Sequence, residues 1–550
     1  MTVDSIEERP IAARKAASRQ PGQMGFVIAV SGFKLTCLLF GADPSDESEE
    51  APPPAQIGSL IRIPTSHAAA FGFIETLAFR NTVLDQPTHG LATAEIDLLG
   101  EATPGDANSP PHFSRGLSVY PVLGAPVFAA TAEDIALIYA KSSTWTLNIG
   151  TLYQDPGKPA FLKSQEFLSK HSAIIGTTGA GKSCALTLIL RALLDAHPNG
   201  HVVVLDPHGE YAPAFSGMAE CITPETLQLP YWLFSFDEIV EVLCSKDRLD
   251  RSHEVGILKE VIVAAKRDAL GTTGQGSHVT VDTPVPYRMH NVLQRISEAM
   301  GKLDRPDVVL PYLRLLSTIE NLRHDRRYAF MFEGLSIRDN MTDILSRIIR
   351  VPVAGQPLTI LDISAVPSEI VNVVVSVLCR LIFDFALWTD RDESIPILLV
   401  CDEAHRYIPR DESLGFEPTR RSISRIAKEG RKYGVSLCLV TQRPSELSEA
   451  ILSQCSTVFA LRMTNESDQS YIRSMLPDSA AGLMNALPTL RQREAIIIGE
   501  GVAHPMRILF AHLEPHFRPK GEATNFPAAW QDDLRTREFI ASVIDRWRRQ

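Results

Sequence analysis

The segment from Gly176 to Ser183, Gly-Thr-Thr-Gly-Ala-Gly-Lys-Ser, constrains the fold of this chain more than any other. It fits the pattern GxxxxGK[ST] at every position. It follows a short apolar run and opens a helical pattern over residues 184–194, which is the strand, loop and helix context that this motif requires. The sequence therefore predicts a phosphate-binding loop in a parallel α/β sheet, with an ordinary glycine-rich turn as the alternative.

The residue types in this loop indicate how a nucleotide would be held. Glycines let backbone N–H groups curl around phosphates, and the helix N-terminus adds a partial positive charge. We expect Lys182 to reach the β- and γ-phosphates of ATP and Ser183 to bind Mg²⁺. The expected nucleotide contacts are Gly176, Thr177, Thr178, Gly179, Ala180, Gly181, Lys182, Ser183 and Cys184.

Two further apolar runs end in polar residues that suit phosphoryl transfer. The run at residues 397–401 ends in Asp402 and Glu403. We expect Asp402 to hold Mg²⁺ through water and Glu403 to orient and polarise the attacking water. A third run ends in Gln442, which we expect to contact the γ-phosphate. The alternatives are a strand-end turn for the two acids and a hydrogen-bonded structural amide for Gln442.

Basic residues follow the helical pattern at residues 419–433. At spacings of four, three and four they are Arg421, Arg425, Lys428 and Lys432. These spacings place them on one helical face. Such a stripe is typical of a solvated face, and it could also face DNA or a neighbouring subunit. Hydrolysis in oligomeric NTPases usually needs a positive charge from a neighbour, an arginine finger.

The pattern of the chain changes after its first quarter. A flexible tail at residues 1–23 precedes many short apolar runs, which predict a small β-barrel over residues 24–155. Strands then alternate with helices, which predicts an α/β core over residues 156–519 with a helical insertion at about 215–355. Residues 520–550 are predicted to form a helical tail.

Charge and cysteine usage narrow the class of protein. The 550 residues include 54 Lys+Arg and 65 Asp+Glu, a net charge of −11, which argues against a simple basic DNA-coating protein. None of the eight cysteines lies in a CxxC pair, which favours reduced thiols over disulfides or a zinc site. The N-terminus shows no signal peptide, and Arg380 and Asp384 interrupt the longest apolar stretch. We therefore expect a cytoplasmic protein without a membrane span.

Several segments, taken in order, resemble the HerA family of hexameric ATPases, which is related to FtsK-type DNA pumps. The segments are 149–152, 171–183, DPHGEY at 206–211, DTPVPY at 282–287, 362–367, DEAHRYIP at 402–409, KEGRKYG at 428–434, TQRP at 441–444, 452–455 and 462–465. The resemblance spans about residues 25–519, and the order of so many segments makes it specific. The acidic loop at 42–54 and the tail after Pro519 have no counterpart in it.

The resemblance implies a HAS-type β-barrel and a RecA-like P-loop ATPase core with a helical insertion. It also implies a homo-hexameric ring with a central channel for duplex DNA and ATP between subunits. Arg431 is the first candidate for the arginine finger and Arg462 the second. His208 and Glu210 are expected on the γ-phosphate side, with a structural role for His208 left open.

The predicted function is ATP-dependent DNA translocation or unwinding. The sequence shows no nuclease carboxylate cluster and no NAD fingerprint. We therefore expect a separate effector chain, a nuclease or an NADase, in anti-phage defence or DNA end processing. The alternative is a nucleotide-switched scaffold that organises and activates an effector. A membrane-anchored pump is disfavoured, since no transmembrane segment is apparent.

Overall fold

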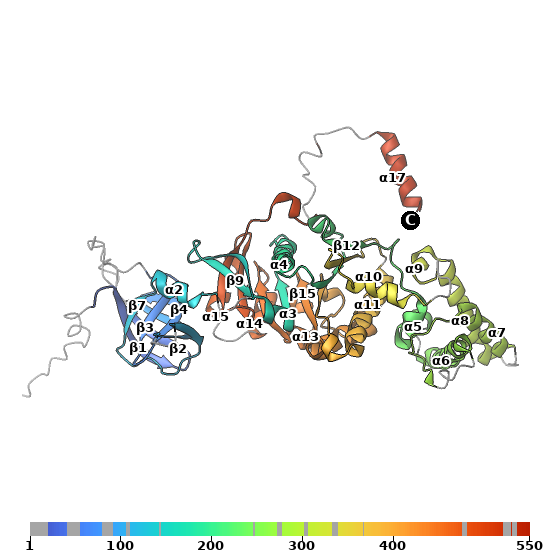
Figure 1. The fold of residues 1–550 in the computed structure, drawn as a ribbon, viewed down its shortest axis with the longest axis horizontal. Helices are drawn as coiled ribbons and strands as arrows, with labels where there is room; N and C mark the ends of the chain where they lie inside the picture. The colour runs from blue at the N-terminus through green and yellow to red at the C-terminus, as the bar shows by residue number, and fades with distance from the viewer. Residues whose placement is uncertain are drawn as a thin grey trace, which may run out of the picture.

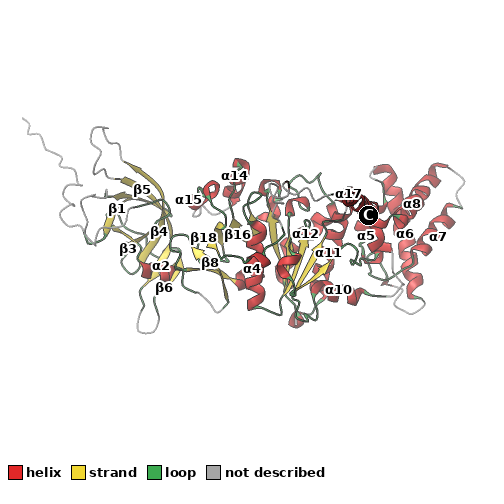
Figure 2. Ribbon diagram, turned by 90° about the horizontal axis from the view of Figure 1, so that it is seen from above, coloured by secondary structure: helices red, strands yellow, loops and turns green. Residues whose placement is uncertain are grey.

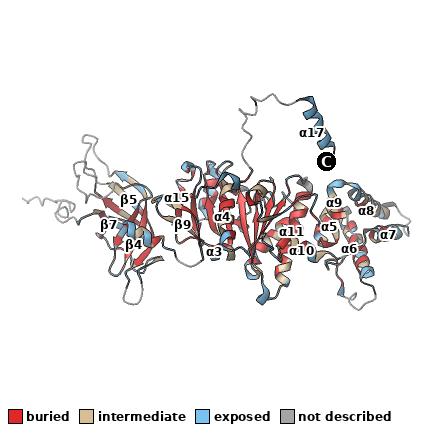
Figure 3. Ribbon diagram, turned by 45° about the horizontal axis from the view of Figure 1, so that its top comes forward, coloured by how far each residue is buried: buried red, intermediate tan, exposed pale blue. Residues whose placement is uncertain are grey.

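A barrel, a large sheet and a helical lobe follow one another along the long axis of the molecule (Figure 1). The computed structural model describes residues 20–40, 55–79, 92–105, 110–141, 145–245, 248–271, 278–301, 306–332, 339–366, 368–475, 481–520, 530 and 536–549. The expected tail lies outside the described residues as far as residue 19, and the acidic loop at 42–54 lies outside them entirely. Helix α17 (Arg537–Arg549) projects from the body and is mostly exposed (Figure 3).

The N-terminal barrel is a closed antiparallel sheet. Its strands are β1 (Gln23–Ser31), β2 (Lys34–Leu39), β3 (Leu60–Pro64), β4 (Ala69–Phe79), β5 (Ala92–Thr103) and β7 (Pro126–Ala129), with β6 (His112–Arg115) added beside β5. Pairing of β2 with β5 closes the ring, so these strands have no free edge. Alternate apolar side chains fill the interior, among them Val27, Cys37, Ile61 and Ile96. Helix α2 (Ala132–Ile138) follows the barrel.

The core is an eleven-stranded sheet among the described residues. Its order is β12 (Ala219–Ile222), β13 (Leu358–Asp362), β11 (His201–Asp206), β14 (Ile397–Cys401), β15 (Val435–Thr441), β10 (His171–Ile175), β16 (Cys455–Ala460), β17 (Glu494–Gly499), β18 (Met506–Phe510), β8 (Thr146–Leu152) and β9 (Pro159–Lys163). The strands from β12 to β16 in this order are parallel, and the remaining pairings are antiparallel. Strand β10 occupies the middle position.

Helices cover both faces of this sheet, so its parallel strands are buried on both sides and consist of continuous apolar runs. Helix α4 (Lys182–Ala196) packs on one face, with Val202 and Val204 of β11. Helices α11 (Ser368–Trp388) and α12 (Glu417–Glu429) pack on the other, with Val203 and Leu205. Shorter helices complete the core: α3 (Ser164–Ser169), α13 (Glu449–Leu452), α14 (Glu466–Met475) and α15 (Ala481–Met484).

Helix α11 contains the longest apolar stretch. Within the described part of the chain, it alone has a window, residues 370–388, that is long and apolar enough to cross a membrane. In the fold, 72% of that window is buried. It packs against α12 and α5, which accounts for its apolar composition.

The helical lobe lies between β12 and β13, where the sequence predicts an insertion at about 215–355. It contains α5 (Phe236–Leu243), α6 (Arg248–Leu270), α7 (Met289–Met300), α8 (Pro306–His324) and α9 (Ala329–Phe332). The chain then returns to the sheet through α10 (Met341–Ile349), which packs on β11 and β13. Figure 2 shows this lobe at the end of the molecule opposite the barrel.

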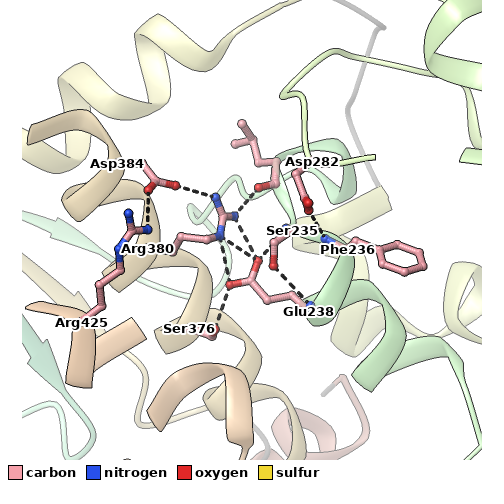
Figure 4. A network of polar contacts seen from close by, with 9 residues as sticks. Ser235, Phe236, Glu238, Asp282, Ser376, Arg380, Asp384 and Arg425 are labelled. Carbon is pink, nitrogen blue, oxygen red and sulfur yellow. Dashed lines mark hydrogen bonds and ion pairs between the residues drawn. The ribbon is translucent and has the colours of Figure 1, made fainter. Parts of the chain in front are cut away.

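A buried polar network joins the lobe to the core, and Figure 4 shows it from close by. Glu238 of α5 accepts hydrogen bonds from Ser376 Oγ at 2.8 Å and Arg380 Nη2 at 3.0 Å, both on α11. It also accepts one from the backbone N–H of Ser235 at 2.8 Å, which caps α5. The Arg380 guanidinium lies 3.4 Å from Asp384. We call these contacts the lobe joint.

The fold class predicted from the sequence is confirmed: an α/β P-loop core, an N-terminal barrel and a helical insertion. The barrel is shorter than expected. We placed its end at residue 155, but β8 pairs with β18 in the core sheet, so residues 146–152 belong to that sheet. The apolar alternation of β8 resembles that of the barrel strands, and only long-range pairing distinguishes them. The short strand β12 was not predicted.

Candidate active site at the phosphate loop

The phosphate loop connects β10 to α4 at the carboxyl edge of the parallel strands. Gly179 and Gly181 have φ of 75° and 97°, the left-handed region that glycine adopts without steric cost. The loop is anchored by Thr177, whose N–H and hydroxyl both donate to the carbonyl of Arg462, at 2.9 and 3.0 Å. These constraints shape the loop before any phosphate binds.

Lys182 is the first residue of α4 and is largely buried. Its ammonium donates to the carbonyl of Thr177 at 3.3 Å, within the loop. Burial lowers the pKa of Lys182, and the nearby carboxylates of Glu403, Asp402 and Glu210 oppose that shift. The side chain therefore lies where the sequence predicts, with three acids close enough to affect its charge.

Asp402 and Tyr211 form a buried pair beside the loop. The Tyr211 hydroxyl donates to Asp402 Oδ2 at 3.0 Å, and Ser183 is close enough to affect the pKa of Tyr211. Burial, followed by the negative charge of Glu403, raises the pKa of Asp402 to about 7. Ser183 and Asp402 thus both lie near the Tyr211 hydroxyl, and oxygen donors of this kind suit Mg²⁺.

Tyr211 belongs to a tight turn after β11 that the DPHGEY segment specifies. The carboxylate of Asp206 accepts from the backbone N–H groups of His208 at 3.2 Å and Tyr211 at 3.0 Å. This turn aims the tyrosine at Asp402. Our sequence reasoning singled out the segment for His208 and Glu210 and missed Tyr211, although a tyrosine after a strand-end aspartate was a usable signal.

Glu403 is held in an unusual way. Its backbone has φ of 50°, a left-handed conformation that costs a non-glycine residue about 1 kcal/mol or more. Its side chain is buried, and its Oε2 atom has no hydrogen-bond partner among the described residues. His208 Nε2 lies 3.7 Å from Oε1, and His405 Nδ1 lies 3.3 Å from Oε2. A strained, incompletely satisfied carboxylate beside a phosphate loop can accept a proton from water.

Gln442 and Arg462 follow the two strands that flank β10. The Thr178 hydroxyl of the phosphate loop donates to Gln442 Oε1. Arg462 meets the loop through its backbone carbonyl. The fold therefore brings Lys182, Ser183, Asp402, Glu403, Gln442 and Arg462 to one edge of the sheet.

Arg431 lies elsewhere. It sits in the 3₁₀ turn Gly430–Tyr433, which precedes β15, so it is at the amino edge of the sheet. Strand β15 separates that edge from Gln442 by about 20 Å at 3.3 Å per residue. Arg431 is exposed, and its charge acts on His171 and Glu500. It is thus remote from the phosphate loop of its own chain.

The basic stripe of α12 is partly neutralised within the chain. Arg421 pairs with Asp237 of the lobe and with Glu417. Arg425 lies 3.5 Å from Asp384, and its guanidinium sits 4.4 Å from the ring centre of Phe383. The stripe begins at the lobe joint, beside a cavity of about 230 Å³. The basic stripe is therefore neither a purely solvated face nor a purely DNA-facing one.

The fold and the site define a P-loop ATPase: a phosphate loop after the middle strand β10, a buried aspartate–glutamate pair after β14, two strands away, and a polar strand end after β15 between them. Residues 147–382 match the family model described as Helicase HerA, central domain. The chain is 25% identical to the DNA double-strand break repair helicase HerA of Pyrococcus furiosus over 470 residues, 77% of each chain.

A second relative, the DNA double-strand break repair helicase HerA of Saccharolobus solfataricus, is 26% identical over 471 residues, covering 82% of this chain and 87% of that one. Among solved structures, VirB4 of Thermoanaerobacter pseudethanolicus superposes with a TM-score of 0.48 at 16% identity, over 68% of this chain and 98% of that one. The family model and the two HerA relatives confirm the resemblance to the HerA family that the motifs indicate.

Proposed function

We propose that this chain is an ATP-driven DNA translocase or helicase that works as a ring of six copies. The observation that supports it most is the set of site residues gathered at the carboxyl edge around the phosphate loop. The relatives carry the name of DNA double-strand break repair helicase, which supports DNA as the substrate. Basic residues of α12, including exposed Lys428 and Lys432, are candidates for contacts with the phosphate backbone.

In the proposed reaction, the phosphate loop binds ATP, and Lys182 neutralises charge that develops on the β- and γ-phosphates. Ser183 and Asp402 hold Mg²⁺, which supplies electrostatic stabilisation of the transferred phosphoryl group. Glu403 orients the attacking water and accepts its proton. Gln442, bonded to Thr178 of the loop, contacts the γ-phosphate and responds to its loss.

Arg431 and Arg462 are the two candidates for the arginine finger, and they differ in their position relative to the phosphate loop. Arg431 is too far from its own phosphate loop to act there, which supports its presentation to the ATP of a neighbouring copy. Arg462 anchors its own loop through its carbonyl and is the second candidate for the finger. ATP would then lie between subunits, and hydrolysis would depend on ring assembly.

An exposed apolar patch on the barrel supports a separate effector partner, a nuclease or an NADase, in anti-phage defence or end processing. The patch combines Ile28 and Val30 of β1 with Tyr120, Val122 and Leu123. The Gly124 N–H bonds the Val27 carbonyl, so the two segments are adjacent. Patches of this kind often mark protein contacts. The same patch favours the second candidate, a nucleotide-switched scaffold that activates the effector. We place either activity in the cytoplasm.

The test compares the wild-type protein with Glu403→Gln. We expect ATPase activity that duplex DNA stimulates and ATP-dependent displacement of a third strand from a DNA triplex. Glu403→Gln should lower both by about 100-fold or more while ATP still binds, since the amide cannot accept the proton. Absence of DNA stimulation and of displacement in the wild-type protein would contradict translocation. Effector activation that persists in Glu403→Gln would favour the scaffold.

A further inference from the structure

The starting observation is the unmet hydrogen-bonding capacity of Glu403. Its Oε2 atom is buried and accepts no hydrogen bond from the part of the chain that the structure describes, which is costly for a carboxylate unless the position serves a purpose. The nearest cationic or donor nitrogen recorded for this oxygen is His405 Nδ1, at 3.3 Å. His405 follows Glu403 in the turn Ala404–Arg406, so the left-handed backbone at Glu403 brings the two side chains together.

His405 Nδ1 faces a second oxygen as well. The hydroxyl of Thr441 lies 3.1 Å from the same nitrogen. Thr441 Oγ1 already accepts from the backbone N–H of Arg443 at 3.1 Å, so its hydroxyl proton is available to donate. Burial lowers the pKa of His405, which favours a neutral ring with one proton. Nδ1 can then either donate to Glu403 or accept from Thr441, but not both.

Thr441 connects this choice to the phosphate loop. It is the last residue of β15 and is fully buried. The next residue, Gln442, accepts a hydrogen bond from Thr178 of the loop. A movement of Gln442 on loss of the γ-phosphate would therefore displace the Thr441 hydroxyl from His405. The path from the phosphate loop to Glu403 therefore runs through Gln442, Thr441 and His405.

We propose that His405 is a positioning residue that couples the strand end Thr441–Gln442 to the carboxylate of Glu403. When Nδ1 donates to Oε2, the carboxylate is fixed with Oε1 facing the water. When Nδ1 accepts from Thr441, it offers no proton to Oε2 and the carboxylate can turn away. The inference rests on the role of Glu403 in the proposed function and adds the residue that controls it.

The test uses the geometry of the imidazole. Asparagine places its amide group near the position of Nδ1, whereas glutamine places it near that of Nε2. We expect His405→Asn to retain kcat for ATP hydrolysis within about threefold, and His405→Gln and His405→Ala to lower kcat by about tenfold or more, because misplacing a base by about 1 Å can cost up to 100-fold. The KM for ATP and the Tm should be unchanged, because Lys182 and the loop are intact.

A second pair of variants tests the other partner of the nitrogen. Thr441→Val is isosteric but lacks the hydroxyl, and Thr441→Ser keeps it. Without the competing hydroxyl, Nδ1 is left to donate to Glu403. We therefore expect the valine variant to raise kcat by about fivefold, corresponding to the removal of one competing hydrogen bond of about 1 kcal/mol, and the serine variant to match the wild type. This pair reports on the coupling even if His405 variants fail to fold.

Three outcomes would overturn the inference. Equal kcat for all His405 variants would show that His405 does not position Glu403. A rise in KM or a fall in Tm that parallels the loss of kcat would indicate a purely structural histidine. Unchanged kcat in Thr441→Val would remove the coupling. Glu403→Gln separates the two levels: if it retains hydrolysis, the proposed role of Glu403 fails, whereas an inactive Glu403→Gln beside fully active His405 variants rejects this inference alone.

Discussion

Two buried glutamates, Glu238 in the lobe joint and Glu403 in the active site, are satisfied in opposite ways. Glu238 accepts hydrogen bonds from a serine hydroxyl, an arginine and a backbone N–H (Figure 4). Glu403 has one oxygen that finds no partner within the described ranges, and its backbone is left-handed. A fully paired carboxylate holds elements together, whereas an incompletely paired one is free to exchange protons. The difference separates structural from chemical acids in one chain.

The comparison predicts that active-site side chains can be removed without unfolding the protein. Lys182→Ala has the largest expected effect on function: ATP binding should weaken by about 100-fold or more, about 2.7 kcal/mol, since the phosphates lose their main cation. Titration with a fluorescent ATP analogue measures this loss. Lys141→Ala, an exposed lysine near the barrel, is the matched control and should bind ATP normally. Tight binding by Lys182→Ala would contradict the assignment of the loop.

Glu238→Ala tests the opposite side of the comparison. It leaves Arg380 without its main partner, and breaking a buried pair typically costs about 3 kcal/mol. Chemical denaturation should show this loss of stability. Glu403→Gln should change stability by less than about 1 kcal/mol in the same assay, since it removes a charge that few groups satisfy. Equal destabilisation by Glu238→Ala and Glu403→Gln would erase the distinction between the two acids.

Tyr211→Phe should have an intermediate effect. It removes one hydrogen bond to Asp402, worth about 1 kcal/mol, and the Mg²⁺ concentration that gives half-maximal ATPase activity should rise about fivefold. Fold stability should change little, because the ring still fills its buried site. A Mg²⁺ dependence identical to that of the wild type would mean that Tyr211 only fills space.

The smallest effect is expected for Arg421→Ala. Its pair with Asp237 is exposed on both sides, so its loss should cost about 0.5 kcal/mol or less. Arg380→Ala, one helix away in the same joint, should cost about 3 kcal/mol because Glu238 is buried. Denaturation curves of the two variants sharpen the contrast between buried and exposed contacts, and similar losses would refute it.

Local patterns in the sequence were sufficient for the sheet and the phosphate loop. The apolar run at residues 397–401 has the same bounds as β14, since fully buried parallel strands are continuous apolar runs. Lys182, Asp402, Glu403 and Gln442 could be predicted because they come after the ends of parallel strands, and the carboxyl ends of parallel strands lie at one edge of the sheet.

Contacts between distant segments could not be predicted in this way. Tyr211 reaches Asp402 across 191 positions, and Arg380 reaches Glu238 across 142. Neither partner carries a local pattern that indicates the other. The same reason explains the misplaced end of the barrel, because only the pairing of β8 with β18 assigns it to the core.

Strand β10 lies midway between the two edges of the core sheet. Five strands lie on each side of it, with the helical lobe inserted beside one outer edge and the barrel connected beside the other. At about 4.8 Å between strands, each edge is about 24 Å from the phosphate loop, so a tilt of about 10° at β10 would swing both ends by about 4 Å in opposite directions. Any tilt of the sheet about β10 would thus move the barrel and the lobe in opposite directions.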